Sequence, residues 1–198
     1  MIELRDVVVA YESRVILDSI NLTINDGETL VILGGSGSGK STLLRLLIGL
    51  QRPTSGQIIV DGTDITTLSE DEFNTVRRKM GMVFQYSALF DSMSVGENVA
   101  FGLRQHTDLG DDEIRRIVAE RLDWVGLKGY ESYMPNELSG GMKKRVSLAR
   151  AIALDPSLIL YDEPSSGLDP ITSGTISMLI KGMQQRLGCT SIVVTHDM

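Results

Sequence analysis

Alternating apolar and polar positions dominate the first part of the chain. Met1 to Val9 and Val15 to Ile24 both alternate, which predicts two strands, and the turn-forming residues Asn25 to Gly27 follow. Thr29 to Leu33 is a short continuous apolar run, typical of a strand buried on both faces. A further strand is predicted from Gln57 to Val60.

Apolar residues recur at helical spacing in several later segments. A capping-box sequence, Ser69 to Glu72, marks one helix start, and Asp169 followed by Pro170 marks another. Gly188 ends the last helix, because glycine readily adopts the left-handed conformation found at helix C-termini. The predicted helices span 41–50, 70–79, 111–125, 138–153 and 170–187.

Three more apolar runs alternate with these helices. Met80 to Gln85, Leu158 to Tyr161 and Thr190 to Thr195 each predict a strand, so the chain is expected to form an α/β fold with a mostly parallel sheet. The stretch from about 87 to 136 has few β-branched runs and predicts a helical insert. We therefore expect one domain over 1–198, with a core of about 1–86 and 151–198 and a helical subdomain of about 87–150.

Composition narrows the possible functions. The 198 residues are 42% hydrophobic and 23% charged, which suffices for a buried core. No apolar run approaches the roughly 18–20 residues that span a bilayer, and the charged N-terminus does not resemble a signal peptide, so a soluble cytosolic chain is expected. The net charge of −7 argues against broad nucleic-acid binding. The single cysteine, Cys189, excludes an internal disulfide and is expected in the core.

A glycine-rich loop follows the predicted strand at 29–33. The run GGSGSGKS matches the pattern G-x-x-x-x-G-K-[ST], in which glycines let backbone N–H groups curl around a phosphate and the next helix adds its positive dipole end. Lys40 is expected to reach the β- and γ-phosphates of a nucleotide, and the Ser41 hydroxyl to bind Mg²⁺. The loop residues are Gly34, Gly35, Ser36, Gly37, Ser38 and Gly39.

An acidic strand end supplies a second candidate feature, in the sequence LILYDE at 158–163. Asp162 can help to hold Mg²⁺ through its water shell. Glu163 can orient or deprotonate an attacking water. Alone, two acids at a strand end also fit a solvated turn, but a phosphate loop in the same chain favours the catalytic interpretation.

A second glycine-rich run, LSGG at 138–141, opens a predicted helix. Ser139 is a natural N-cap, and Gly140 and Gly141 leave the backbone open, so this helix start could bind an anion. Taken by itself, the run needs no explanation beyond a helix cap.

Six features occur together and in order: Gly34–Ser41, Gln85 in MVFQ, the run Leu138–Gly141, Asp162–Glu163, Ser166–Asp169 and His196. Together they resemble the ABC-type ATPases, the nucleotide-binding subunits of ABC transporters, in which the run at 138–141 is the signature. The resemblance spans essentially the whole chain and implies a phosphate-loop NTPase fold of ABC type. That fold has a RecA-like core with a mostly parallel sheet, an antiparallel β subdomain and a helical subdomain.

The resemblance also explains why one chain carries two glycine-rich loops. In that family two copies form a head-to-tail homodimer, and each ATP lies between the phosphate loop of one copy and the signature loop of the other. Ser139 and Gly141 would contact the γ-phosphate of the partner's ATP, and Asp169 would act across the interface. The implied ATP-binding residues are Tyr11, which would stack on adenine, Gly34 to Ser41, Thr42, Ser139, Gly140, Gly141 and Asp169.

Catalytic roles carry over from the same resemblance. Glu163 would be the base, and His196 would hold the γ-phosphate and position both Glu163 and the water. Gln85 would sense Mg²⁺ and link the site to a membrane partner, while Lys40 would bind phosphate. The implied metal-binding residues are Ser41, Gln85 and Asp162.

Met142 stands where the family signature usually has Gln. LSGGM together with DPIT at 169–172 resembles the Mla-type, phospholipid-trafficking branch, whose ATPases work with an integral-membrane permease and a lipid-binding MCE protein. The resemblance therefore implies a peripheral location at the cytoplasmic face of the inner membrane, with no nucleic-acid partner expected.

Other functions fit the motifs less well. The alternative within transport is an importer of a polar solute such as an amino acid, whose members usually keep Gln after the glycines. A non-transport ABC ATPase is disfavoured because the chain shows neither a long coiled coil nor a tandem copy. A kinase or small GTPase would not explain the signature or His196.

Three expectations concern the remaining sequence. Lys143, Lys144 and Arg145 are expected to form a solvated helix face, or to add positive potential near a partner's phosphate. His106 is expected at the surface. The chain ends two residues after His196, whereas members of the family continue, so a form shortened at its C-terminus is expected.

Overall fold

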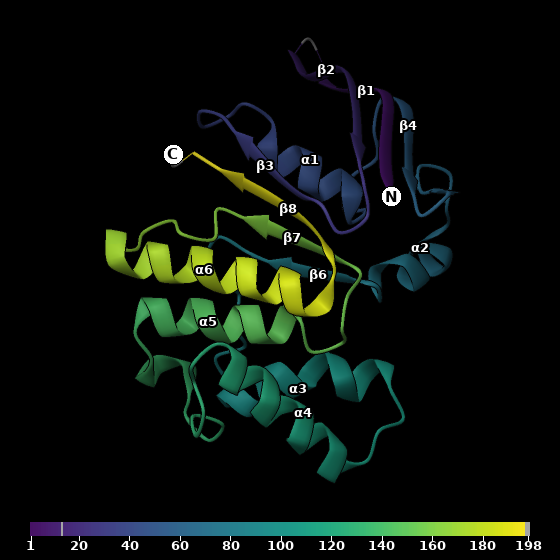
Figure 1. Ribbon diagram of the computed structural model, residues 1–198. Coiled ribbons are helices and arrows are strands. Elements are labelled where there is room, and N and C mark those ends of the chain that lie inside the picture. The colour runs from purple at the N-terminus through teal and green to yellow at the C-terminus, as the bar shows by residue number, and fades with distance from the viewer. Residues whose placement is uncertain (13, 197–198) are drawn as a thin grey trace.

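The computed structural model describes residues 1–12 and 14–196 (Figure 1). Strands and helices alternate through most of the chain. The strands are β1 (Ile2–Tyr11), β2 (Arg14–Ile24), β3 (Thr29–Leu33), β4 (Ser55–Val60), β5 (Thr63–Asp64), β6 (Met80–Val83), β7 (Leu158–Asp162) and β8 (Thr190–Thr195). The helices are α1 (Lys40–Leu47), α2 (Glu70–Arg77), α3 (Val95–His106), α4 (Asp111–Trp124), α5 (Gly140–Ala151) and α6 (Pro170–Leu187), with a short 3₁₀ turn at Pro135–Glu137.

Two sheets organise the molecule. One is antiparallel with the order β2-β1-β4-β5, and the other is parallel with the order β3-β8-β7-β6. Figure 1 shows α1 between the two sheets, α5 and α6 on the opposite face of the parallel sheet, and α3 and α4 beyond them. The expected α/β fold, with a parallel core and an antiparallel β portion, is confirmed.

The hydrophobic core has two parts, one on each face of the parallel sheet. Leu44 of α1 and Leu160 of β7 belong to the cluster shared with the antiparallel sheet. Ile159, the neighbour of Leu160, points to the other face and joins a cluster with Val99 of α3 and Leu122 of α4. The helical segment thus shares its core with the sheet, and the subdomain boundary at 87–150 stays a prediction.

The prediction that 29–33 is buried on both faces is wrong. Val31 and Leu33 are 52% and 54% exposed, whereas Leu30 and Ile32 pack on the core shared with α1. β3 is an edge strand that pairs only with β8 among the described strands. A continuous apolar run cannot reveal which face a neighbouring layer covers, because that depends on residues distant in sequence.

Helix starts follow the sequence closely. Ser69 and Glu72 form the predicted capping box of α2, and Ser94 and Glu97 form a second one at α3 that sequence inspection missed. Asp169 caps α6 as predicted. In the part of the chain that the structure describes, no helix combines the length and apolarity needed to cross a bilayer.

Candidate active site

The candidate site lies where the parallel strands end. The loops that follow β3, β6 and β7 meet the end of β8 at this edge of the sheet (Figure 1). Carboxyl ends of parallel strands are the usual place for ligands in open α/β sheets. Side chains separated by more than a hundred residues therefore converge there.

The phosphate loop forms a tight bend that only glycine accommodates at two points. Gly37 and Gly39 have φ angles of 79° and 93°, in the left-handed region. A Cβ at Gly39 would also lie 2.8 Å from Leu17 Cδ2. Helix α1 begins directly after this glycine, so its unpaired N–H groups point toward the loop.

Lys40 is buried at the centre of the loop. Its Nζ donates to the main-chain oxygens of Gly34 at 2.6 Å and Gly35 at 3.0 Å, and lies 3.6 Å from Glu163 Oε1. The ammonium is thus held by groups that an anionic ligand could replace. The Lys40 ammonium is therefore well placed to bind phosphate oxygens.

The two acids at the end of β7 have different partners, Ser41 for Asp162 and Lys40 for Glu163. Ser41 Oγ donates to Asp162 Oδ1 at 3.0 Å, so the predicted metal ligands from α1 and β7 are brought together. Gln85 lines one cavity with Ser41, and its Nε2 donates to Ser166 Oγ at 3.4 Å. A hydroxyl, a carboxylate and an amide are the hard ligands that Mg²⁺ prefers.

Glu163 is held in a specific and strained conformation. Its φ is 47°, uncommon for a residue with a side chain, and its N–H donates to Val194 O at 2.9 Å. Glu163 Oε2 accepts from the N–H of His196 at 3.1 Å and lies 2.7 Å from His196 Nδ1. Since Glu163 Oε1 faces Lys40, this carboxylate lies between two basic side chains.

A cavity of about 800 Å³ opens over these groups. Tyr11 is 51% exposed at its edge, consistent with an aromatic platform. Two lining residues were not expected from the sequence, Arg14 and Arg45. Arg14 pairs with Tyr11 across the hairpin, and Arg45 lies one helical turn beyond Ser41. The lining is Tyr11, Arg14, Ile16, Gly35, Ser36, Gly37, Ser38, Gly39, Lys40, Ser41, Thr42, Arg45, Gln85, Glu163 and His196.

The second glycine-rich loop, at 138–141, lies outside this cavity. Of the described residues, Ser139, Gly140, Gly141 and Asp169 do not line this cavity. Ser139 caps α5 by accepting from the N–H of Met142 at 3.3 Å. The signature run is therefore a helix start that does not share the cavity of its own phosphate loop.

The Asp169 carboxylate caps the neighbouring helix α6. It accepts from the N–H groups of Ile171 and Thr172, both at 3.1 Å, and from Thr172 Oγ1 at 2.6 Å. The hydrogen bonds with Thr172 lower the pKa of Asp169 below its ordinary value. Gly141 packs against the same Thr172, so the two helix starts are neighbours.

The prediction for the basic run after the signature is wrong at one residue. Lys143 and Arg145 are partly exposed, but Lys144 is only 4% exposed. Its Nζ donates to main-chain oxygens of the loops after β6 and β7. Helical spacing alone does not identify this, because those loops come from other parts of the chain. His106 is exposed as expected.

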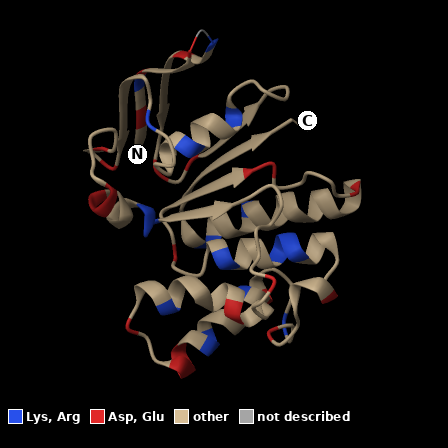
Figure 2. Ribbon diagram, turned by 180° about the vertical axis from the view of Figure 1, so that it is seen from behind, with Lys and Arg blue, Asp and Glu red and all other residues tan. Residues whose placement is uncertain are grey.

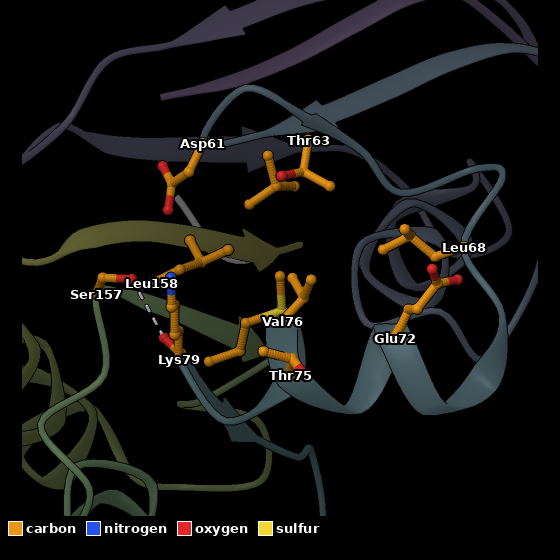
Figure 3. A pocket seen from close by; sticks show the side chains of 11 residues that line it. Asp61, Thr63, Leu68, Glu72, Thr75, Val76, Lys79, Ser157 and Leu158 are labelled. Atoms are coloured by element: carbon orange, nitrogen blue, oxygen red, sulfur yellow. Dashed lines mark hydrogen bonds between the residues drawn. The ribbon is translucent and has the colours of Figure 1, made fainter.

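A second pocket, of about 350 Å³, lies among β4, β5, α2 and the starts of β6 and β7 (Figure 3). Leu68, Val76 and Leu158 give it an apolar lining, and the exposed residues Asp61 and Lys79 add polar side chains. It contains none of the predicted site residues. The predicted chemistry therefore belongs to the larger cavity at the opposite ends of the strands.

Comparison with known families gives a consistent result. The ABC transporter family matches residues 17–166. The chain is 50% identical over 197 residues to the intermembrane phospholipid transport system ATP-binding protein MlaF of Haemophilus influenzae, covering 100% of this chain and 75% of that protein. It is 48% identical over 196 residues to the probable ribonucleotide transport ATP-binding protein mkl of Mycobacterium bovis, covering 99% of this chain and 55% of that protein.

Solved structures share the fold. An ATP-binding cassette captured as a dimer in a post-hydrolysis state with ADP and Pi superposes with a TM-score of 0.90. It is 36% identical, and the match covers 100% of this chain and 88% of that one.

Proposed function

Because the chain belongs to the ABC transporter family, we propose that it is the ATP-hydrolysing subunit of an intermembrane phospholipid transporter. The observation that carries the enzymatic part is the meeting of Lys40, Glu163 and His196 in one cavity. The 50% identity to a phospholipid transport ATP-binding protein supports the transport part. The combination of LSGGM and DPIT in this chain supports the same branch.

Phosphate binding would begin with an exchange at Lys40. Its Nζ leaves the carbonyl oxygens of Gly34 and Gly35 for the β- and γ-phosphate oxygens of ATP. The N–H groups of the loop and of the first turn of α1 surround the same phosphates. Tyr11, at the cavity edge, would stack on the adenine.

The hydroxyl of Ser41 and the carboxylate of Asp162 fit Mg²⁺, with Gln85 completing the set. When bound, the ion would neutralise charge on the β- and γ-phosphates. Ser41 and Asp162 are already 3.0 Å apart, so little rearrangement of the chain is required.

Hydrolysis would use Glu163 as the base. Once Lys40 turns to phosphate, Glu163 Oε1 is free to take a proton from water while that water attacks the γ-phosphorus. The bond from the γ-phosphorus to the β–γ bridging oxygen then breaks, giving ADP and inorganic phosphate. His196 holds Oε2 and thereby fixes the orientation of the carboxylate.

The active unit would be a head-to-tail homodimer. The position of Ser139 and Gly141 outside the cavity supports this, because an open helix N-terminus is left for the phosphate of a second copy's ATP. A related cassette was solved as a dimer. Two copies would close when ATP binds and separate after hydrolysis.

A membrane permease would dock beside Gln85. Phe84 and Tyr86, its neighbours in the chain, and Phe90 farther along are 38%, 87% and 41% exposed, and large exposed aromatic residues are typical of docking surfaces. An MCE-type lipid-binding protein would complete the complex at the inner membrane, with this subunit on its cytoplasmic face.

A second candidate cargo comes from the relative named as a ribonucleotide transport protein, which is almost as similar. The ATP site does not distinguish these cargoes, because the partner proteins contact the cargo. Purification of the intact complex from its native membrane, with mass spectrometry of bound proteins and lipids, separates them. A co-purified MCE protein with phospholipid is expected, and a permease with a solute-binding protein would contradict phospholipid transport.

The enzymatic proposal is tested with Glu163→Gln. The amide cannot accept the proton from water, so we expect ATP turnover to fall by about two orders of magnitude or more while ATP binding persists. Size-exclusion chromatography with saturating MgATP should then show a dimer that the parent protein forms only transiently. A Glu163→Gln protein that still hydrolyses ATP at the parent rate would contradict the role of this residue.

A further inference from the structure

Lys144 is a buried cation five residues after Ser139 on helix α5. Its side chain donates to the main-chain oxygens of Gln85, of Glu163 at 3.4 Å and of Phe84 at 3.5 Å. An ammonium group has three N–H donors, so the three carbonyls account for all of them. Burial lowers the pKa of Lys144, and the nearby carboxylates of Asp162 and Glu163 oppose that shift.

The three carbonyls belong to two different loops of the active site. Phe84 and Gln85 follow β6, and Glu163 follows β7. One side chain therefore ties the helix that begins at the signature loop to both strand ends that carry Gln85 and Glu163. A buried ammonium does not leave such partners easily, because it would lose them without gaining water.

Arg150 makes a second connection from the same helix to the loop after β6. Its guanidinium donates to Ala88 O at 2.7 Å and Ser87 O at 3.1 Å. Ser87 and Ala88 have φ angles of 62° and 48°, a left-handed conformation that side chains disfavour without support. Basic residues lie in both halves of α5 (Figure 2). Lys144 from the first half and Arg150 from the second both hold the loop after β6.

We propose that Lys144 is a positioning residue that couples the signature loop to Gln85 and Glu163. This rests on the proposed function, in which ATP on a second copy binds at the N-terminus of α5. A shift of the 12-residue helix α5 on closure would carry the Lys144 ammonium, and the two strand ends would move with it. Binding of the partner's ATP would thereby align the water-activating groups of this copy.

The test compares three variants of the full chain. Lys144→Met removes the charge and the donors at similar volume, and Lys144→Arg keeps both. Lys181→Met makes the same change at an exposed position of α6. For each we would measure kcat and KM for ATP, the affinity for a fluorescent ATP analogue, and hydrogen exchange of the amides at 84–88 and 163–166.

Lys144→Met is expected to lose about tenfold or more in kcat with the affinity for the analogue changed less than about threefold. Hydrogen exchange of the amides at 84–88 should be faster in Lys144→Met than in the parent. Lys144→Arg should recover kcat to within about threefold of the parent value. Lys181→Met should have the kcat of the parent. If Lys144→Met does not fold, Lys144→Gln, which keeps two donors, replaces it with the same expectation.

Parent-like kcat and exchange in the Lys144 variant would overturn the inference. So would an equal loss in Lys144→Met and Lys144→Arg, since the coupling requires the charge and its donors. Failure of the proposed function would give a different result. The parent protein itself would hydrolyse no ATP, or Glu163→Gln would hydrolyse ATP at the parent rate. In that case the exchange data still decide whether Lys144 orders the two loops.

Discussion

At the residue scale, the two glycines of the signature run differ in what surrounds them. A Cβ at Gly141 would lie 2.6 Å from Thr172 Cγ2, whereas a Cβ at Gly140 would lie 3.9 Å from Leu168 Cδ2. The first distance is too short for two carbon atoms, and the second is ordinary contact. Gly141 therefore allows α5 to approach α6, while Gly140 is not required for packing.

This difference predicts opposite effects of two alanine substitutions in the same helical turn. Gly140→Ala should leave stability unchanged or raise it by about 0.5–1 kcal/mol, the usual helix preference for Ala over Gly. Gly141→Ala should lower it by about 1–3 kcal/mol, because Thr172 and its hydrogen bond to Asp169 must shift. Urea unfolding of both variants measures this, and equal stabilities would contradict the packing argument.

At the scale of elements, helix starts depend on carboxylates that reach back to the cap residue. Glu97 Oε2 accepts from the N–H of Ser94 at 2.7 Å, and the Ser94 hydroxyl accepts from the N–H of Glu97 at 3.2 Å. The bonds with Ser94 lower the pKa of Glu97 below its ordinary value of 4.5. The ionised carboxylate is therefore preferred in the folded protein.

A pH dependence follows from this lowered pKa. As the pH falls below about 4.5, the unfolded chain binds the proton more readily than the folded one, so the contribution of Glu97 is present above that pH and lost below it. Glu97→Gln, whose amide oxygen can still accept from Ser94, should lose less thermal stability than the parent below pH 4.5. Melting curves of the parent and of Glu97→Gln against pH should show this. Parallel curves for Glu97→Gln would contradict it.

At the scale of the whole molecule, the proposed dimer places Lys40 and Ser139 of different copies around one ATP. Ser139→Asp should preserve the helix cap, since Asp caps as well as Ser, but its charge repels the partner's γ-phosphate. Lys40→Ala should remove phosphate binding from the other side. Each variant alone is expected to be inactive, because both sites of its dimer are defective.

Mixing the two variants should restore activity. A mixed dimer has one doubly defective site and one intact site, formed by Lys40 from the Ser139→Asp copy and Ser139 from the Lys40→Ala copy. With equal amounts, about half of the dimers are mixed, so about a quarter of the parent turnover is expected. ATPase assays of the mixture measure it, and a mixture as inactive as its components would contradict the head-to-tail arrangement.

The sequence by itself determined the order of elements and most of the chemistry. Helix caps at Ser69 and Asp169 depend only on residues a few positions away, and so do the glycine turns at 34–39. They can therefore be predicted from the local sequence. The motif residues were likewise identifiable, because Lys40 closes a glycine loop that follows an apolar strand, and Asp162 and Glu163 stand at the end of another. Their shared edge follows from the rule for parallel strands.

Only the tertiary structure decided which faces are covered and which charges are buried. Val31 and Leu33 are exposed because their face of β3 is left uncovered, and Lys144 is buried because it reaches the loops after β6 and β7. The place of Arg14 at the cavity likewise depends on segments that are separate in the sequence. Which neighbours cover a face or pair with a charge depends on segments distant in the sequence, so a local pattern cannot identify them.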